Sequence, residues 1–188
     1  MNDDTLYHLD PKACALLVVD IQENLMRVIH GQEEVAKNAA LLVRAAKVLD
    51  IPIVATTQYV TRIGPFVAPV VEALGEVSAL DKLEFDCFNN EAIKAAVKRL
   101  PASVNTLILC GVETHICVYQ TALGALKAGY RVWVAADAVS SRVKKNYKLG
   151  LARLREMGAV VGTTEMIIYD WLGKAGTPEF KALLPLLR

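Results

Sequence analysis

Short apolar runs alternate along this chain with segments in which apolar residues recur every three or four positions. Continuous apolar runs of about five residues are typical of strands that are buried on both faces of a parallel sheet. Such runs predict strands at residues 15–19, 51–56, 106–111, 131–136 and 159–163. A further, short strand is predicted just before Lys82. The helical periodicity predicts intervening helices at residues 33–49, 70–74, 90–100, 115–128, 144–157, 165–172 and 178–187.

Repeated alternation of strand and helix implies right-handed crossover connections, which place the strands in one parallel sheet with helices on both faces. The expected fold is therefore an α/β, Rossmann-like three-layer sandwich with a six-stranded, mostly parallel sheet. A chain of 188 residues is ordinary for one domain. Because the sequence contains no internal repeat, low-complexity tract or interdomain linker, we predict a single domain over residues 1–188.

The charge is balanced, with 21 Lys and Arg against 20 Asp and Glu and a formal net charge of +1. This balance does not indicate a nucleic-acid partner. No apolar run is long enough to span a bilayer, and residues 1–11 lack the apolar core of a signal peptide. The four cysteines are dispersed without a C-x-x-C pair, which is typical of a reducing cytoplasm. We therefore predict a cytoplasmic protein with no membrane or nucleic-acid partner.

The hydrophobic content of 54% is high for a chain of this length. It suits a sheet that is buried on both faces, and it suits a subunit interface as well. The apolar helices after the fourth and fifth strands, with Trp133 and Trp171 nearby, favour the same interpretation. We therefore expect a homo-oligomer, either a dimer or a larger assembly.

Ligands of open parallel sheets bind outside the carboxyl ends of the strands, so residues that follow the strands are the candidates for chemistry. Asp20 follows the first strand, Lys82 the third, and Cys117 lies just after the fourth. Cys117 falls in the first turn of the next helix, where the helix dipole and free N–H groups favour a thiolate. Cysteines inside the strands, Cys14 and Cys110, are better explained as small buried hydrophobic residues.

The chain lacks the common sequence motifs for cofactors and for a serine nucleophile. Neither G-x-G-x-x-G, nor G-x-x-x-x-G-K-[ST], nor G-x-S-x-G occurs. The three histidines, His8, His30 and His115, form no metal-binding pattern. We therefore predict neither a cofactor nor a catalytic metal, and expect a small-molecule substrate.

Ordered motifs carry a resemblance to a known family. They are residues 18–22 (VVDIQ), Lys82 with Phe85 after it, residues 111–118 (GVETHICV) and residues 137–142 (DAVSSR). In this order and spacing they resemble the isochorismatase-like cysteine hydrolase superfamily over nearly the whole chain. The chain looks closest to the small isochorismatase-domain-containing proteins, many of which have no assigned substrate.

The resemblance implies a catalytic role for three residues. Cys117 is the expected nucleophile, Asp20 takes its proton and passes it to the leaving group, and Lys82 holds both in place. An acid beside a thiol raises the thiol pKa, whereas a lysine and a helix N-terminus lower it, so their competition decides how much thiolate exists. The resemblance also implies a cis peptide between Val112 and Glu113. This peptide would aim the backbone N–H groups of Glu113 and Cys117 into an oxyanion hole.

Further residues near the strand ends are expected to line a substrate pocket: Gln22, Gln58, Tyr59, Phe85, His115 and Tyr119. Each of them also has a purely structural interpretation. The aromatic residues fit a place in the core equally well, and the polar residues fit a role as loop anchors. A position at the end of a strand does not by itself separate the two interpretations.

Two departures from family patterns narrow the expected chemistry. Members that hydrolyse the vinyl ether of isochorismate lack this cysteine, so we do not expect an isochorismatase. Nicotinamidases of the family carry an Asp-x-His metal site after the second strand, whereas residues 58–62 (QYVTR) contain no histidine. The expected function is therefore metal-independent hydrolysis of an amide or related C–N bond in a small molecule, through a covalent acyl-enzyme on Cys117.

Two other functions stay open from the sequence. One is a binding or scaffold protein that keeps the fold without useful turnover, because fold and site do not name a substrate. The other is a redox role for Cys117, for which Cys87 is the candidate resolving cysteine. Failure across a wide substrate panel would favour the first function. Rapid peroxide oxidation with disulfide formation would favour the second.

Overall fold

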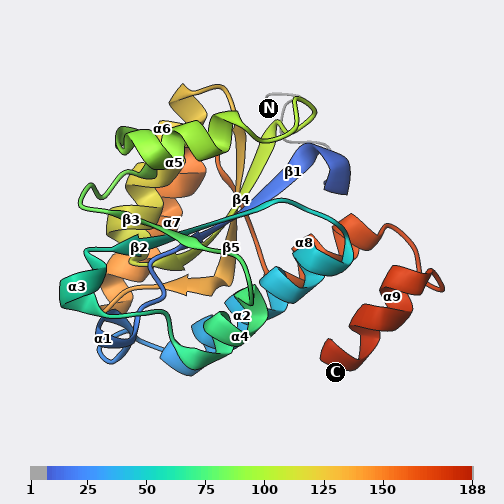
Figure 1. Ribbon diagram of the computed structural model, residues 1–188, viewed down its shortest axis with the longest axis horizontal. Coiled ribbons are helices and arrows are strands. Elements are labelled where there is room, and N and C mark those ends of the chain that lie inside the picture. The colour runs from blue at the N-terminus through green and yellow to red at the C-terminus, as the bar shows by residue number, and fades with distance from the viewer. Residues whose placement is uncertain (1–7, 188) are drawn as a thin grey trace.

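The computed structural model describes residues 8–187, and within them six parallel strands form one sheet (Figure 1). The spatial order is β3-β2-β1-β4-β5-β6. The strands are β1 (Cys14–Val19), β2 (Ile53–Gln58), β3 (Ala79–Lys82), β4 (Thr106–Val112), β5 (Arg131–Ser140) and β6 (Val160–Gly162). The predicted α/β sandwich is confirmed. Residues 1–7, which are part of the segment assessed above for a signal peptide, lie outside the described residues.

Helices cover both faces of this sheet. They are α1 (Glu23–Met26), α2 (Gln32–Val48), α3 (Val60–Ile63), α4 (Ala68–Leu74), α5 (Glu91–Lys98), α6 (Tyr119–Lys127), α7 (Lys144–Glu156), α8 (Thr164–Leu172) and α9 (Pro178–Leu183). Helices α2, α4 and α8 pack on one face, and α5, α6 and α7 pack on the other (Figure 1). In the part of the chain that the structure describes, no helix is both long enough and apolar enough to cross a bilayer.

The strands are buried on both faces, so alternate residues pack into opposite apolar layers. In β1, Leu16 and Val18 join the layer that includes α2. Leu17 and Val19 join the layer that includes α6. Because both faces are covered, the strand sequences are continuous apolar runs and do not alternate with polar residues.

Gly111 allows β4 to lie against β1 at the edge where both strands end. Its φ is +130°, and a Cβ atom would lie 1.9 Å from the carbonyl oxygen of Val19. Only glycine fits this approach, because any side chain would clash with the backbone of β1. Val19 and Gly111 are partners in the parallel ladder. Asp20 and the turn that follows β4 therefore emerge from the same edge of the sheet on neighbouring strands.

Some element boundaries differ from the prediction. β5 continues to Ser140 instead of ending at residue 136, and its pairing with β4 shifts register between Leu109 and Gly111. The helix expected at 115–128 divides into a π-helical turn (Thr114–Val118) and α6, and the loop after β2 contains α3. Strand pairing and contacts at the sheet edge, which act between distant segments, set these boundaries, so local patterns do not reveal them.

Candidate active site

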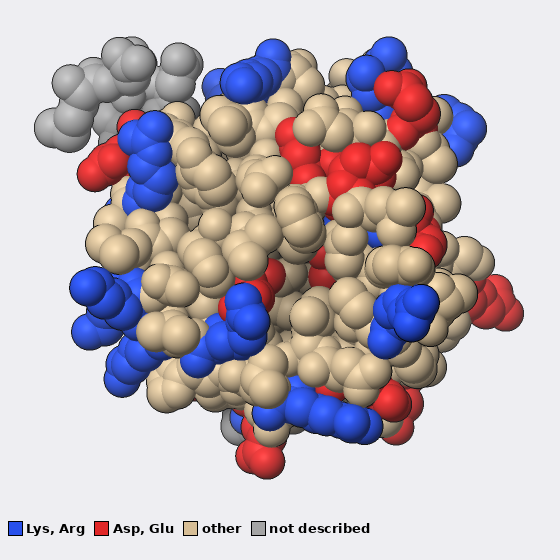
Figure 2. Space-filling model, turned by 90° about the vertical axis from the view of Figure 1, so that its left-hand side faces the viewer, with Lys and Arg blue, Asp and Glu red and all other residues tan. Residues whose placement is uncertain are grey.

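The carboxyl ends of β1, β2, β3 and β4 meet at one edge of the sheet. Helices α1 and α3, which follow β1 and β2, lie on the left of Figure 1, and Figure 2 views the molecule from that side. The surface is hollowed near the middle of this face, and acidic side chains are visible at the hollow. Asp20, Lys82 and Cys117 all lie where strands end at this edge or in the turn that follows.

Asp20 and Lys82 form an ion pair that is buried from solvent. Lys82 Nζ donates to Asp20 Oδ2 at 2.6 Å, and both side chains are 0% exposed. Thr56 Oγ1, from β2, donates to the other carboxylate oxygen at 2.9 Å. Buried charges need both an opposite charge and hydrogen bonds of good geometry. The Asp20 carboxylate has both, with the ammonium group on one oxygen and the hydroxyl group on the other.

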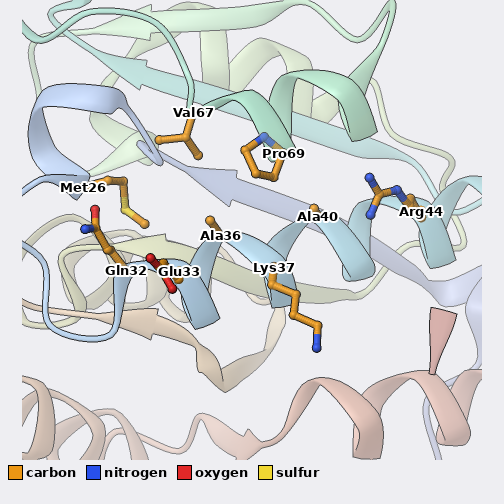
Figure 3. Close-up of a pocket in the computed structure, with 9 residues that line it drawn as sticks. All are labelled: Met26, Gln32, Glu33, Ala36, Lys37, Ala40, Arg44, Val67 and Pro69. Atoms are coloured by element: carbon orange, nitrogen blue, oxygen red, sulfur yellow. The ribbon is translucent and has the colours of Figure 1, made fainter. Parts of the chain in front are cut away.

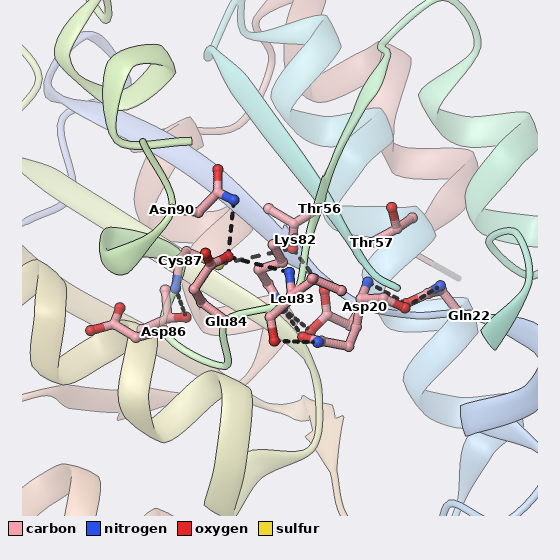
Figure 4. Close-up of polar contacts among 12 residues, drawn as sticks. Asp20, Gln22, Thr56, Thr57, Lys82, Leu83, Glu84, Asp86, Cys87 and Asn90 are labelled. Carbon is pink, nitrogen blue, oxygen red and sulfur yellow. Dashed lines mark hydrogen bonds and ion pairs between the residues drawn. The ribbon is translucent and has the colours of Figure 1, made fainter. Parts of the chain in front are cut away.

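Gln58 holds Lys82 from its other side, and Gln22 in turn holds the backbone of Gln58. Figure 4 shows Lys82, Asp20 and Gln22 among their polar contacts. Gln58 Oε1 accepts a hydrogen bond from Lys82 Nζ at 2.7 Å, and Gln58 Nε2 donates to the carbonyl of Leu83 at 2.8 Å. Gln22 accepts from the N–H of Gln58 at 2.7 Å and donates to the carbonyls of Gln58 at 3.1 Å and Gly64 at 2.6 Å. Both amide groups are therefore engaged within the protein, and Gln58 positions Lys82. The place of the two glutamines in a substrate pocket stays a prediction.

Cys117 lies in the π-helical turn between β4 and α6, which we call the cysteine turn (Thr114–Val118). The residue is 6% exposed, and its thiol lies close enough to Asp20 for the carboxylate charge to act on the thiol pKa. Burial raises the pKa of the Cys117 thiol far above its ordinary range, the charge of Asp20 raises it further, and Lys82 acts in the opposite direction. The competition therefore favours a protonated thiol at rest.

The protonation states of Asp20 and Lys82 follow from their burial and from each other. Burial raises the pKa of Asp20 above its ordinary value, and the ammonium group of Lys82 counteracts this effect. Burial alone would lower the pKa of Lys82, but Asp20 and two nearby thiols together raise it. Lys82 therefore stays an ammonium group at neutral pH, and Asp20 is the hydrogen-bond acceptor at the centre of the cluster.

The peptide bond between Val112 and Glu113 is cis, and it stands immediately before the cysteine turn. The Glu113 carboxylate accepts hydrogen bonds from the backbone N–H of Arg142 at 2.8 Å and from Arg142 Nε at 3.0 Å. The Glu113 side chain is 7% exposed, whereas that of Arg142 is 58% exposed. These contacts join the end of β4 to the segment that follows β5.

The aromatic residues predicted for the pocket lie in different surroundings. Tyr59 is 44% exposed and Phe85 is 52% exposed, so neither belongs to the core. Tyr119, the first residue of α6, is half-buried and hydrogen bonded to Arg153 of α7. None of these three side chains has a hydrogen-bond partner among Asp20, Lys82 and Cys117 within the described residues.

His115 stands two residues before the nucleophile candidate, but its ring contacts the residue that follows β5 and a residue of α7. Nδ1 lies 2.9 Å from Ser141 Oγ, and Nε2 lies 3.3 Å from Asn146 Nδ2. The thiol of Cys117, by contrast, is influenced by Asp20, which follows β1. The two side chains of one turn therefore face different segments.

Thr56 and Cys87 belong to the cluster but were not among the predicted site residues. Thr56 Oγ1 lies 2.9 Å from Asp20 Oδ1 and 3.9 Å from Cys87 Sγ. Cys87 is fully buried, and burial raises the pKa of its thiol to about 11. The sequence signal that could have indicated the contact of Thr56 with Asp20 is the pair of polar residues Thr56 and Thr57 near the end of an apolar run.

Within residues 8–187, no group of three or more His, Cys, Asp or Glu side chains is placed to hold a metal ion. A groove of about 400 Å³ lies between α2 and the start of α4 (Figure 3). Ala36 and Ala40 line one side, and Val67 and Pro69 line the other. Ala36 and Ala40 belong to the apolar layer on one face of the sheet, whereas Cys117 belongs to the opposite layer. The groove is therefore separate from the buried cluster.

Comparison with known proteins identifies the family. Residues 14–166 match the isochorismatase domain. This chain belongs to the isochorismatase family. The secreted isochorismatase effector Isc1 of Phytophthora sojae is 36% identical over 193 aligned positions, which cover 97% of this chain and 88% of the effector. Isochorismatase domain-containing protein 2 of Bos taurus is 34% identical, with 95% of this chain and 84% of that protein covered.

The isochorismatase-family fold is also found among solved structures. The structure of MAR1 ribonuclease from Caenorhabditis elegans matches with a TM-score of 0.88 at 31% identity, and the match covers 96% of this chain and 92% of that chain. The resemblance and the fold class predicted from the motifs are both confirmed. Family membership supports a hydrolase. It does not indicate a cellular location, because the Phytophthora relative is named as a secreted protein.

Proposed function

We propose that this isochorismatase-family protein is a metal-independent cysteine hydrolase that cleaves an amide or related C–N bond of a small molecule. The observation that carries the proposal is the buried ion pair of Lys82 and Asp20, whose charges both act on the thiol of Cys117. Burial of an ion pair costs desolvation free energy that the mutual attraction of the charges only partly offsets, so such a pair is weak evidence for a purely stabilising role. Buried ionisable groups with shifted pKa values, located at the carboxyl edge of a parallel sheet, are typical of catalytic sites.

In the first step, Cys117 Sγ attacks the carbonyl carbon and its proton moves to Asp20. A carbon–sulfur bond forms, and the carbonyl oxygen becomes an oxyanion. Because the thiol is protonated at rest, proton transfer has to accompany attack, and the Asp20 carboxylate is the nearby proton acceptor. Asp20 then gives the proton to the leaving nitrogen, the C–N bond breaks, and an amine leaves behind an acyl-enzyme thioester.

In the second step, water attacks the carbonyl carbon of the thioester. Asp20, again a carboxylate, accepts a proton from the water molecule. The carbon–sulfur bond breaks, and the proton passes to the sulfur of Cys117. Lys82 keeps its proton throughout, because Asp20 and the two thiols raise its pKa. Its positive charge stabilises the Asp20 carboxylate and any negative charge that develops on sulfur.

The backbone N–H groups of Glu113 and Cys117 are the proposed donors to the oxyanion. The N–H of Glu113 belongs to the cis peptide at Val112–Glu113, and the N–H of Cys117 lies in the cysteine turn that follows it. Donors that are fixed before the reaction stabilise developing charge without reorganisation. The contact between Glu113 and Arg142 restrains the first of these residues.

Several statements about this protein's context stay predictions. They are a homo-oligomeric state, a cytoplasmic location, the absence of a cofactor and of a nucleic-acid partner, and a single domain over residues 1–188. The balanced charge of the chain supports the prediction on nucleic acid. Tyr59 and Phe85, which are exposed, stay candidates for contact with the substrate.

The first test is the rate of iodoacetamide alkylation at Cys117 as a function of pH, mapped by mass spectrometry. Lys82→Met keeps most of the side-chain length without the positive charge, so the thiol pKa rises and we expect alkylation at pH 8 to slow by about tenfold for each pKa unit. Lys98→Met is the matched control, because Lys98 is exposed on α5. Equal rates in the native protein and Lys82→Met would contradict the coupling of Lys82 to Cys117.

The second test is turnover of a panel of small amides. Cys117→Ala should abolish hydrolysis of any substrate found, whereas Cys14→Ala, at a buried thiol in β1, should retain it. Retained hydrolysis in Cys117→Ala would overturn the proposal. No turnover across the panel, with Cys117 no more reactive than Cys87, would favour a binding or scaffold protein. A peroxide-induced Cys87–Cys117 disulfide would favour the redox alternative.

A further inference from the structure

We propose that His115 is a positioning residue, which ties the cysteine turn to the segment after β5 and thereby keeps Cys117 against Asp20. The inference rests on the proposed role of Cys117, and it adds an anchor that lies outside the buried cluster of Asp20 and Lys82. The anchor consists of both ring nitrogens of His115, the hydroxyl of Ser141 and the amide of Asn146.

The two contacts define the hydrogen-bonding state of the imidazole. Asn146 presents its amide nitrogen, which can only donate, so Nε2 of His115 is the acceptor. Nδ1 then carries the proton and donates to Ser141 Oγ at 2.9 Å. A neutral ring of this tautomer satisfies both contacts at once, and a side chain without hydrogen-bonding atoms satisfies neither.

The anchor is one of three connections between the cysteine turn and the α7 side of the molecule. The second is the pair of hydrogen bonds from Arg142 to the Glu113 carboxylate. The third is the packing of α7 at Gly150, where a Cβ atom would lie 3.1 Å from Thr114 Cγ2 and 3.2 Å from the backbone nitrogen of His115. Glycine inside a helix lowers helix stability by about 1 kcal/mol relative to alanine. Its presence in α7 is explained by this close approach.

The cysteine turn is an irregular element, so contacts with neighbouring segments help to hold its conformation. The N–H of Val118 donates to the carbonyl of Glu113 at 3.2 Å, the wide hydrogen-bonded ring of a π-helical turn. π-helical turns of this kind are rare and are frequent at functional sites. The thiol of Cys117 lies near Asp20, whereas His115 contacts Ser141 and Asn146. Holding His115 in place therefore restricts how far the thiol can move from Asp20.

Loss of the anchor has a measurable effect on the thiol. Burial and the nearby carboxylate of Asp20 hold the pKa of Cys117 high, and Lys82 and Cys87 are the other ionisable groups that influence it. If the turn moves away from Asp20, both burial and repulsion decrease, so the thiol pKa falls toward its ordinary value of 9.0. The thiol then reacts faster with iodoacetamide at neutral pH, although its proton acceptor for catalysis is no longer in place.

The test compares His115→Phe with His115→Asn by the pH profile of Cys117 alkylation. Phenylalanine keeps a ring without hydrogen-bonding atoms, and asparagine keeps an N–H near the position of Nδ1. In the His115→Phe variant we expect Cys117 to be alkylated about threefold faster, or more, than in the native protein at pH 7.5. A threefold change corresponds to about half a pKa unit. His115→Asn should lie close to the native profile, because the contact with Ser141 is restored.

Alkylation of Cys87, which is fully buried, reports general unfolding in the same samples. Protected Cys87 together with faster Cys117 in His115→Phe supports the proposal. A native Cys117 profile in a folded His115→Phe variant overturns it. If His115→Phe does not fold, Ser141→Ala and Asn146→Ala remove the same hydrogen bonds from the partner side, and native profiles in both overturn the proposal. Failure of the proposed hydrolase function gives a different result from failure of the His115 proposal. In that case Cys117→Ala would retain hydrolysis, whichever residue stands at position 115.

Discussion

Lys82 Nζ reaches Asp20 Oδ2 at 2.6 Å across the end of the strand that separates them in the sheet. Lys82 ends β3 and Asp20 follows β1, with β2 between the two strands. Both side chains are fully buried, so removing one charge leaves the other without compensation, which typically costs about 3–5 kcal/mol. The contact therefore links the stability of the fold to the reactivity of Cys117, whose pKa depends on both groups.

Asp20→Asn should increase the reactivity of Cys117 while it abolishes hydrolysis. The negative charge of Asp20 raises the pKa of the Cys117 thiol, so its removal lowers that pKa and speeds iodoacetamide alkylation at pH 8. Hydrolysis fails because no carboxylate remains to accept the thiol proton. The measurements are the alkylation rate, turnover and the melting temperature, which should fall because Lys82 is left unpaired.

The matched control for this variant is Asp50→Asn, because Asp50 is exposed in the turn after α2. It should change none of the three measurements appreciably. Slower alkylation of Cys117 in Asp20→Asn would mean that Asp20 activates the resting thiol, in contradiction to the direction of the pKa shift described here.

Gln58→Leu should alter the reactivity of Cys117 even when no substrate is present. The substitution removes the acceptor for Lys82 Nζ and the donor to the carbonyl of Leu83, and an unsatisfied buried polar group costs about 1–3 kcal/mol. A displaced Lys82 no longer lowers the thiol pKa as effectively, so alkylation at pH 8 should slow. Gln32→Leu, at an exposed position in α2, is the control. If Gln58→Leu leaves the alkylation rate of Cys117 unchanged but raises KM, Gln58 acts in substrate binding and not through Lys82.

The stability of the protein should fall at alkaline pH in part because of Cys87. Burial raises the pKa of this thiol from 9.0 to about 11. The folded state therefore keeps a proton that the unfolded state releases, and the stabilisation is complete below pH 9 and is lost as the pH rises to about 11. The expected loss is about 2–3 kcal/mol across this interval.

Chemical denaturation of the native protein and Cys87→Ala at several pH values between 8 and 11.5 measures this contribution. The free energy of unfolding should fall less steeply with pH in Cys87→Ala than in the native protein. Equal slopes would show that Cys87 does not titrate differently in the folded and unfolded states.

Gly111→Ala should be far more destabilising than Gly129→Ala. Both glycines have positive φ, at +130° and +88°, so both substitutions strain the backbone. A Cβ atom at position 111 would in addition lie 1.9 Å from the carbonyl oxygen of Val19, whereas nothing lies within 4 Å at position 129. We expect a loss of about 1 kcal/mol for Gly129→Ala, measured by urea denaturation. Similar losses in the two variants would contradict the close approach of β1 and β4.

The elements that were predicted most accurately are those whose environment is uniform along the chain. β1 and β4 are buried on both faces, so their apolar runs mark them almost to the residue. α7 begins at Lys144 as predicted, and Asn90 caps α5, because its side-chain oxygen accepts hydrogen bonds from the backbone N–H groups of Ala92 and Ile93. β5 was cut short because its last residues include Asp137, whose polar side chain accepts hydrogen bonds from Thr164 instead of facing solvent.

By itself, the sequence determined the order of strands and helices, the family, and the three side chains Asp20, Lys82 and Cys117 at one edge of the sheet, because apolar periodicity and motif spacing are local properties of the chain. The tertiary structure decided what these groups contact and which of them hold protons. Gln58 positions Lys82 and Gln22 holds the backbone of Gln58, and burial outweighs the positive charge of Lys82 in setting the protonation state of the thiol. Desolvation of these groups and their hydrogen-bond distances of 2.6 to 3.1 Å arise only when distant segments pack together. A local pattern along the chain therefore does not predict them.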